Sequence, residues 1–192
     1  MFKARIWAFV ALLLLPFAVT AHEIEAKPTT IAVYIQAQDY NYQLRLHHYS
    51  TGYWYSQGPM LEEAAMDVLG QDFKEVAMCD DNPASAKVLI WLRPRMFYNP
   101  QVQTFYGKVI AYAYRADGKP IANFVGENEQ HGFLDIKPEL HLQAAYRGAI
   151  EAVSAKMQAD VKVQQALKDP SFSVPCATTA LLPEPKIQFM GF

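Results

Sequence analysis

The histidines are the residues of this sequence best suited to hold a metal ion. His22 would become the amino-terminal residue if a leader were removed after Ala21, and such a histidine binds copper through its amine and ring nitrogen. A further ligand would come from His47, His48 or His131. Copper or small-ligand binding at His22 is therefore the alternative function, which mass spectrometry of the mature amino terminus would test. The plainer interpretation is that cleavage merely happens before a histidine.

The sequence holds two cysteines, Cys79 and Cys176. In an exported protein such a pair is more typical of a disulfide than of a metal site, because the compartment is oxidising and two thiols are too few for zinc. We therefore expect a disulfide between them. The alternative is two separate thiols, one buried and one in a tail.

An aromatic cluster between residues 40 and 57 is the least ordinary feature of the sequence. Large amphipathic rings are enriched at interfaces, which favours a contact surface for a partner protein, a glycan or a lipid. The alternative is cross-strand pairing and packing against a helix, with Trp54 in the core and the tyrosines outside it. The predicted contact residues are Tyr49, Tyr53, Trp54 and Tyr55, followed by Phe189 and Phe192 near the end of the sequence.

Patterns typical of catalysis are missing from the sequence. It has no Gly-x-Ser-x-Gly, no His-Glu-x-x-His and no glycine-rich loop for phosphates or dinucleotides. Its paired acidic residues fit a helix start, a turn and a solvated strand face: Glu62 with Glu63, Asp80 with Asp81, and Glu127 with Glu129. We expect a protein that is not an enzyme and needs no cofactor.

Residues 1–21 have the three parts of a secretory signal peptide. Lys3 and Arg5 precede an apolar run, and small residues end at Ala21. No cysteine follows for lipid attachment, and no later apolar stretch is long enough to span a membrane. We expect export to the periplasm, cleavage, and a mature form without a transmembrane segment.

Composition narrows the class of partner. The sequence is 52% hydrophobic with a formal net charge of -2, and removal of the leader leaves 19 Asp+Glu against a smaller number of Lys+Arg. Nucleic-acid binding needs clustered cations, so this class of partner is excluded. A mature chain of this size buries enough surface for one core.

The elements that must position these residues follow from apolar spacing and turn signals. Strands are expected at 29–36, 86–97, 103–115 and 119–129, the last two joined by Asp117-Gly118. A hairpin with its turn near 50–52 fits residues 40–57, and Arg93-Pro94-Arg95 places the far end of strand 86–97 at an edge or bulge. Helices are expected at 60–78 and from 138 to about 167, although the helical stripe weakens after Val161.

This order of elements predicts an α+β fold in which an antiparallel sheet carries two long helices on one face. The expected divisions are a signal peptide at 1–21, a flexible leader at 22–28, one α+β domain at 29–168 and a proline-rich tail at 169–192. The opposite face of the sheet then meets solvent or a partner.

The segment from Tyr42 to Phe73 resembles the start of the ABC-type transport auxiliary lipoproteins. The likeness lies in a tyrosine-rich strand pair that reaches Trp54, then Pro59 and a helix carrying Leu61, Ala65 and Leu69. Later elements are similar too, namely the strand 88–92, the turn 115–120 and the closing helix. The layout also resembles the lipoproteins of lipopolysaccharide assembly and Pel polysaccharide secretion, but the lipidated cysteine of the family is missing here.

Taken together, export, the missing catalytic motifs, the aromatic hairpin and this resemblance predict a non-enzymatic periplasmic accessory protein. It would bind an envelope protein complex or a membrane-associated transporter in the transport or assembly of lipid, lipopolysaccharide or polysaccharide.

Overall fold

The computed structural model describes residues 28–48, 51–79 and 85–169, together with Cys176, Thr179 and Leu182. Several sequence predictions concern residues outside this part of the chain. They are the signal peptide 1–21, the leader up to residue 27, His22, Tyr49, and the tail rings Phe189 and Phe192.

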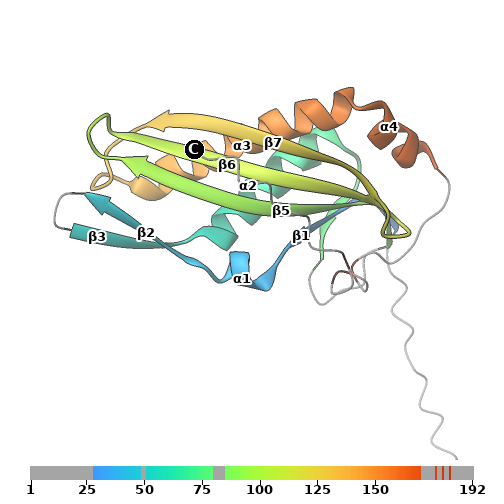
Figure 1. Cartoon of the computed structure of the whole chain (residues 1–192), viewed down its shortest axis with the longest axis horizontal. Helices are drawn as coiled ribbons and strands as arrows, with labels where there is room; N and C mark the ends of the chain where they lie inside the picture. Colours follow the sequence, from blue (N-terminus) through green and yellow to red (C-terminus); the bar gives the residue numbers. More distant parts are fainter. Residues whose placement is uncertain are drawn as a thin grey trace, which may run out of the picture.

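A five-stranded sheet in the order β4-β1-β5-β6-β7 forms the centre of the molecule (Figure 1). β5, β6 and β7 are antiparallel, whereas β1 pairs in parallel with both β4 and β5. The α+β class is confirmed, but the prediction of a wholly antiparallel sheet is wrong. A parallel pair needs a crossover between its strands, and here α2 lies in the chain between β1 and its two partners. The strands are β1 Pro28–Ile35, β4 Val76–Met78, β5 Ser85–Asn99, β6 Thr104–Arg115 and β7 Pro120–His131.

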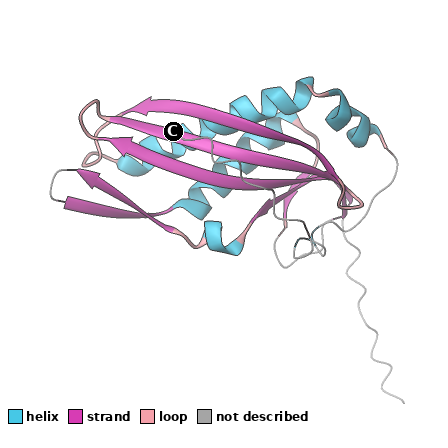
Figure 2. Cartoon of the chain, in the orientation of Figure 1, coloured by secondary structure: helices cyan, strands magenta, loops and turns pink. Residues whose placement is uncertain are grey.

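The described residues form four helices instead of the two expected. The two longest are α2 (Gln57–Asp72) and α3 (Pro138–Ala159), and both lie on the same face of the sheet (Figures 1 and 2). The other two are short: α1 (Ala37–Tyr40) follows β1, and α4 (Val161–Lys168) follows α3. We call the sheet face opposite α2 and α3 the outer sheet face.

The main core lies between the sheet and these two helices. The predicted stripe of α3 is fully buried from Leu142 to Met157, but Val161 is 68% exposed. The helix expected to continue past residue 160 is interrupted there, because the Asp160 side chain accepts hydrogen bonds from the backbone N–H groups of Lys162 and Val163 and so caps a new helix. The weakening of the helical stripe near Val161 therefore coincides with the break between α3 and α4.

The predicted helix 60–78 is also shorter than expected. α2 ends at Asp72, Phe73 has extended backbone angles, and Glu75 adopts a left-handed conformation with φ of 56°. The chain then forms β4, which pairs in parallel with β1. Long-range pairing overrides the local helical spacing here, since β4 satisfies one edge of β1 and the backbone N–H of Cys79 donates to the Val33 carbonyl oxygen.

Two strand predictions are confirmed. β6 and β7 are joined by the Asp117-Gly118 turn, where Gly118 has a φ of 80°. Pro94 lies within β5, and its missing N–H is tolerated because the pairing of β1 with β5 stops at Leu92. Beyond that point β5 pairs on one side only, with β6, as the edge interpretation requires.

Candidate functional site

The aromatic cluster forms a separate two-stranded hairpin, as predicted, at one end of the molecule (Figure 1). β2 (Gln43–His48) pairs with β3 (Thr51–Ser56) in a register that places His48 opposite Thr51. Side chains alternate between two faces because the period of a strand is two. One face packs on the protein, and the other carries Arg45, His47, Gly52 and Trp54; we call these four residues the hairpin face.

The inner side of the hairpin is fixed by a second core cluster. Leu44, Leu46 and Tyr55 are each less than 10% exposed. They pack against the ends of β5 and β6 and the start of α3, where their partners are Tyr98, Phe105, Leu134, Leu142 and Ala145. Burial of three large side chains holds a hairpin that would be only marginally stable by itself.

The base of the hairpin is held by Gln57, a buried polar residue. Its side-chain N–H group donates to the Asp39 carbonyl oxygen at 3.1 Å, and its side-chain oxygen accepts from the Tyr146 hydroxyl at 3.1 Å. The amide therefore links α1, the start of α2 and the middle of α3. Burial raises the pKa of Tyr146, which keeps this hydroxyl a donor.

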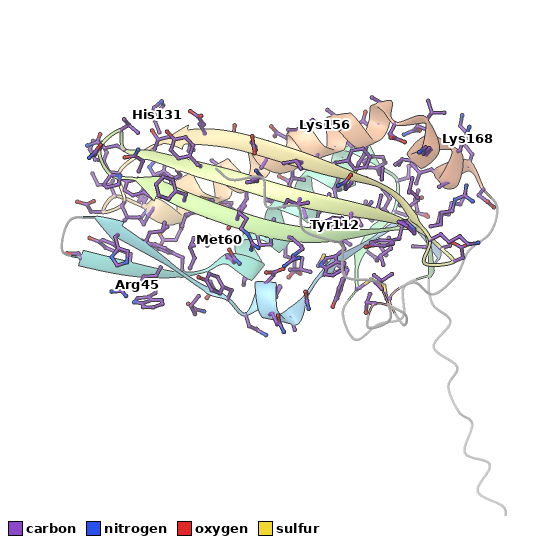
Figure 3. The ribbon with its side chains drawn as sticks, viewed as in Figure 1. Arg45, Met60, Tyr112, His131, Lys156 and Lys168 are labelled. Carbon is purple, nitrogen blue, oxygen red and sulfur yellow. A yellow bond between two sulfur atoms is a disulfide. The ribbon has the colours of Figure 1, made fainter. Side chains whose placement is uncertain are left out.

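Among the described rings of the two hairpin strands, Trp54 is the most exposed, with 60% of its surface accessible. The Arg45 guanidinium, on the paired position of β2, lies 5.2 Å from the centre of the indole. Figure 3 shows Arg45 projecting from the hairpin on the side away from the five-stranded sheet. A Cβ at Gly52 would lie 3.1 Å from the Arg45 Nε atom, so glycine leaves room for this stacked arrangement.

The predicted contact rings of the hairpin differ in how far they face outward. Tyr55 was expected to be a contact residue but is 8% exposed, because it faces the core with Leu44. Tyr53 is partly buried against the same cluster. Trp54 faces away from the core, which reverses the interpretation that placed Trp54 inside and the tyrosines outside.

The electrostatic setting of Tyr55 follows from this burial. Loss of hydration raises its pKa to about 12, and the nearby charges of Glu139 and Asp135 and the neighbouring Tyr53 add to the effect. The hydroxyl is therefore neutral at physiological pH. No acid–base role follows from it.

The outer sheet face carries an open hollow of about 700 Å³ near the C-terminal ends of β5 and β7. Phe97 is 51% exposed and lies 6.0 Å from the Tyr106 ring, measured between ring centres. Lys108 pairs with Glu127 at 2.7 Å on the same face. The hollow combines aromatic and charged side chains from three strands; its lining includes Phe97, Asn99, Tyr106, Lys108, Glu127 and Glu129.

The predicted cysteine pair is a disulfide in the structure. It joins Cys79, just after β4, to Cys176, and both cysteines contact an aromatic cluster on the outer sheet face. The bond therefore holds Cys176 against this face.

The histidines within the described residues do not converge. His47 lies on the hairpin face, His131 Nδ1 is 2.8 Å from the Thr104 hydroxyl, and His141 stacks on Phe105. Among the residues that the structure describes, no group of three or more His, Cys, Asp or Glu side chains is placed to hold a metal ion. The copper hypothesis concerns His22, outside these residues.

Sequence reasoning missed three features of these surfaces: Arg45, Gln57 and the Phe97–Tyr106 pair. The expected turn near 50–52 gives a different strand register. In the observed register His48 lies opposite Thr51, and this register places Arg45 across from Trp54. The position of Gln57, directly before Gly58-Pro59 at the start of a predicted helix, could have indicated a structural role for its side chain. The Phe97–Tyr106 pair depends on the register of β5 with β6, which no local pattern fixes.

No protein-family model and no curated protein matches the sequence. Among solved structures, a candidate lipoprotein from Caulobacter crescentus matches with a TM-score of 0.37 and 16% identity, covering 60% of this chain and 87% of that one. A PelC dodecamer from Paraburkholderia phytofirmans matches with a TM-score of 0.38 and 11% identity, covering 67% and 88%. Both scores lie below 0.5, so the chain is not assigned to the family of either protein. A search for membrane-spanning segments found no helix of sufficient length and hydropathy in the described part of the chain.

Proposed function

We propose that this chain is a non-enzymatic accessory protein of the cell envelope that binds a protein partner through the hairpin face. The observation that carries the proposal is the exposed Trp54 ring with the Arg45 guanidinium stacked on it. Tryptophan and arginine are the side chains most enriched among residues that dominate binding energy at protein interfaces. Export to the periplasm and a role in envelope transport or assembly come from the sequence and belong to the same proposal.

The rigidity of the hairpin supports this role. Binding costs less when contact side chains are already held in place, because fewer rotamers are lost on association. Trp54 is flanked on its own strand by the partly buried Tyr53 and the buried Tyr55, and its cross-strand neighbour Arg45 restricts the indole. The hairpin face thus presents a large ring on a fixed support.

Charge supports a protein partner over nucleic acid. The formal net charge of the chain is -2, and on the hairpin face Arg45 is the sole permanently charged side chain. A surface of one tryptophan and one arginine matches the centre of a protein interface, where charges are few and aromatic residues and arginine are enriched. Tyr49 and Tyr53, predicted contacts on the same hairpin, stay part of the proposal.

Photo-cross-linking in the native host tests this function. A photoreactive phenylalanine analogue at position 54 should form a discrete adduct with one envelope protein in living cells. The control is the same analogue at Val161, which is 68% exposed on α4. The adduct should disappear when Arg45→Ala is added. Equal adducts from positions 54 and 161, or none from position 54, would contradict the proposal.

A further inference from the structure

The hollow on the outer sheet face lies where β5 and β7 end and β6 begins (Figure 1). The strand registers place Phe97 on β5, Tyr106 on β6 and Glu129 on β7 in one row across the sheet. Two spacings between neighbouring strands make this row about 10 Å long. Phe97 is 51% exposed, so the row presents an aromatic surface to solvent and carries a carboxylate at its β7 end.

Polar side chains border this row on both sides. On one side, Lys108 of β6 pairs with Glu127 of β7 at 2.7 Å. On the other side lies Asn99, whose side-chain oxygen accepts a backbone N–H of the following turn at 3.0 Å. Among the described residues, no group pairs with the Asn99 amide nitrogen or with the Glu129 carboxylate. One donor and one acceptor beside the rings are therefore available to a ligand.

We infer that this hollow binds a neutral oligosaccharide, with a sugar ring packed on Phe97 and Tyr106. One face of a pyranose ring carries mainly C–H groups and packs on the negative face of an aromatic ring, while its rim carries hydroxyl groups that donate and accept hydrogen bonds. The hollow combines these features, since aromatic rings lie beside amide and carboxylate groups. The inference rests on the hollow alone and does not depend on the proposed function.

The charges of the hollow favour a neutral ligand. Lys108 and Glu127 neutralise each other, which leaves the Glu129 carboxylate without an ion-pair partner among the described residues. Glu129 would repel a phosphate or a uronic acid, whereas Arg95, opposite Lys108 in the strand register, would repel a cation. A hydroxyl group can instead donate to Glu129 and form a charge-assisted hydrogen bond.

The size and lining of the hollow argue against a lipid chain. Its volume of about 700 Å³ lies within the range of small-molecule sites. Apart from Phe97 and Gly107, every lining residue carries a polar group on its side chain. An acyl chain would remove water from these groups without replacing their hydrogen bonds, which is unfavourable. A ligand with hydroxyl groups around an apolar ring face avoids this cost.

Nuclear magnetic resonance mapping on the full chain tests the site. The probes are maltohexaose, cellohexaose, mannohexaose and chitohexaose, which are neutral and differ in linkage or ring substituents. At least one should shift the backbone amide signals of Phe97, Tyr106 and Glu129 in a saturable manner and leave that of Trp54 unchanged. Failure of all four probes to bind, or shifts confined to the β2–β3 hairpin, would overturn the inference.

Single substitutions test which groups bind the oligosaccharide. Phe97→Ala should weaken binding about tenfold, because a sugar ring loses its stacking surface. This ring is half-exposed, so the variant should keep the circular dichroism of the wild type. The matched control is Phe133→Ala, which removes a ring that is 47% exposed outside the hollow and should leave the affinity unchanged. Equal affinities of Phe97→Ala and the wild type would overturn the inference.

Ionic probes separate the other ligand classes. Tetramethylammonium chloride and inorganic phosphate are titrated under the same conditions, and neither should displace the oligosaccharide from the Phe97 signal. Glu129→Gln should weaken oligosaccharide binding severalfold without abolishing it, because an amide oxygen still accepts a hydrogen bond. Stronger binding of tetramethylammonium than of any sugar, lost in Glu129→Gln, would show a cation site and overturn the inference. Stronger binding of phosphate would overturn it as well.

Discussion

Trp54 and Tyr55 are adjacent on β3 and have opposite surroundings: the Trp54 ring is 60% exposed, and the Tyr55 ring is 8% exposed. The alternation of the strand separates an anchoring side chain from a contact side chain one residue away. Stability and binding can therefore be changed independently in this hairpin.

Alanine substitution at these two positions should separate the two roles. Tyr55→Ala removes a buried ring and should lower the free energy of unfolding by about 3 kcal/mol. Trp54→Ala loses an exposed cation–π contact and should cost at most about 1 kcal/mol. It should also weaken binding of the partner that the cross-link from position 54 identifies. Urea unfolding measures both values. Equal destabilisation by the two variants would show that Trp54 is a structural residue.

The pKa of Tyr55 predicts a stability loss at alkaline pH. An unfolded tyrosine releases its proton near pH 10, whereas burial holds the folded pKa at about 12. Between these values the unfolded state loses protons first, so the contribution of Tyr55 is complete below about pH 10 and falls as pH rises toward 12, by at most about 1.4 kcal/mol per pH unit.

Tyr55→Phe checks this sign. Urea unfolding of the wild type should show a falling free energy above about pH 10, and the variant should show a shallower fall, because one titrating group is gone. The remaining slope comes from other tyrosines with raised pKa, including Tyr40, Tyr114 and Tyr146. Parallel curves for the two proteins would contradict the assignment to Tyr55.

Two glycines predict opposite effects of the same substitution. A Cβ at Gly126 on β7 would overlap the backbone carbonyl of Ala149, because α3 packs tightly against the sheet at this point. Gly126→Ala should therefore cost about 3 kcal/mol, since neither backbone can move without disturbing the core. Gly70→Ala is the control: apart from the neighbouring residues and backbone of α2 itself, no atom lies within 4 Å of its Cβ position, and it should gain about 0.5–1 kcal/mol. A destabilising Gly70→Ala, or a neutral Gly126→Ala, would contradict this packing.

Local signals in the sequence were sufficient for the β6–β7 hairpin and for the first part of α3. Asp117-Gly118 determines its turn through backbone preferences, and the stripe from Leu142 to Met157 matches one helical face. Both depend on residues close together in the chain. The same holds for the existence of the β2–β3 hairpin.

Features set by distant residues could not be predicted in this way. Val76, Ala77 and Met78 continue a helical spacing, yet they form β4 because β1 offers a free edge more than forty residues earlier in the chain. The exposure of Trp54 depends on which hairpin face meets the core, and both faces carry aromatic rings. The hollow at Phe97 and Tyr106 depends on pairing between two strands, and its lining residues look ordinary in sequence.

The disulfide gives the last prediction, because it joins the edge of the sheet to the outer sheet face. Cys79 and Cys176 are 97 residues apart, so the bond closes a loop for which the chain-entropy model gives about 4–5 kcal/mol. Replacing both cysteines by alanine should lower the free energy of unfolding by that order and the Tm by roughly 10–15 °C.

In the chain-entropy model the loss comes mainly from the unfolded state, which gains conformational freedom when the bond is absent. Serine at both positions is the matched control, since it has a similar volume and a different polarity; the alanine and serine variants should lose the same stability, as should the wild type under reducing conditions. Calorimetry and urea unfolding measure the change. A loss below about 1 kcal/mol would mean that the unfolded chain already keeps these two segments together.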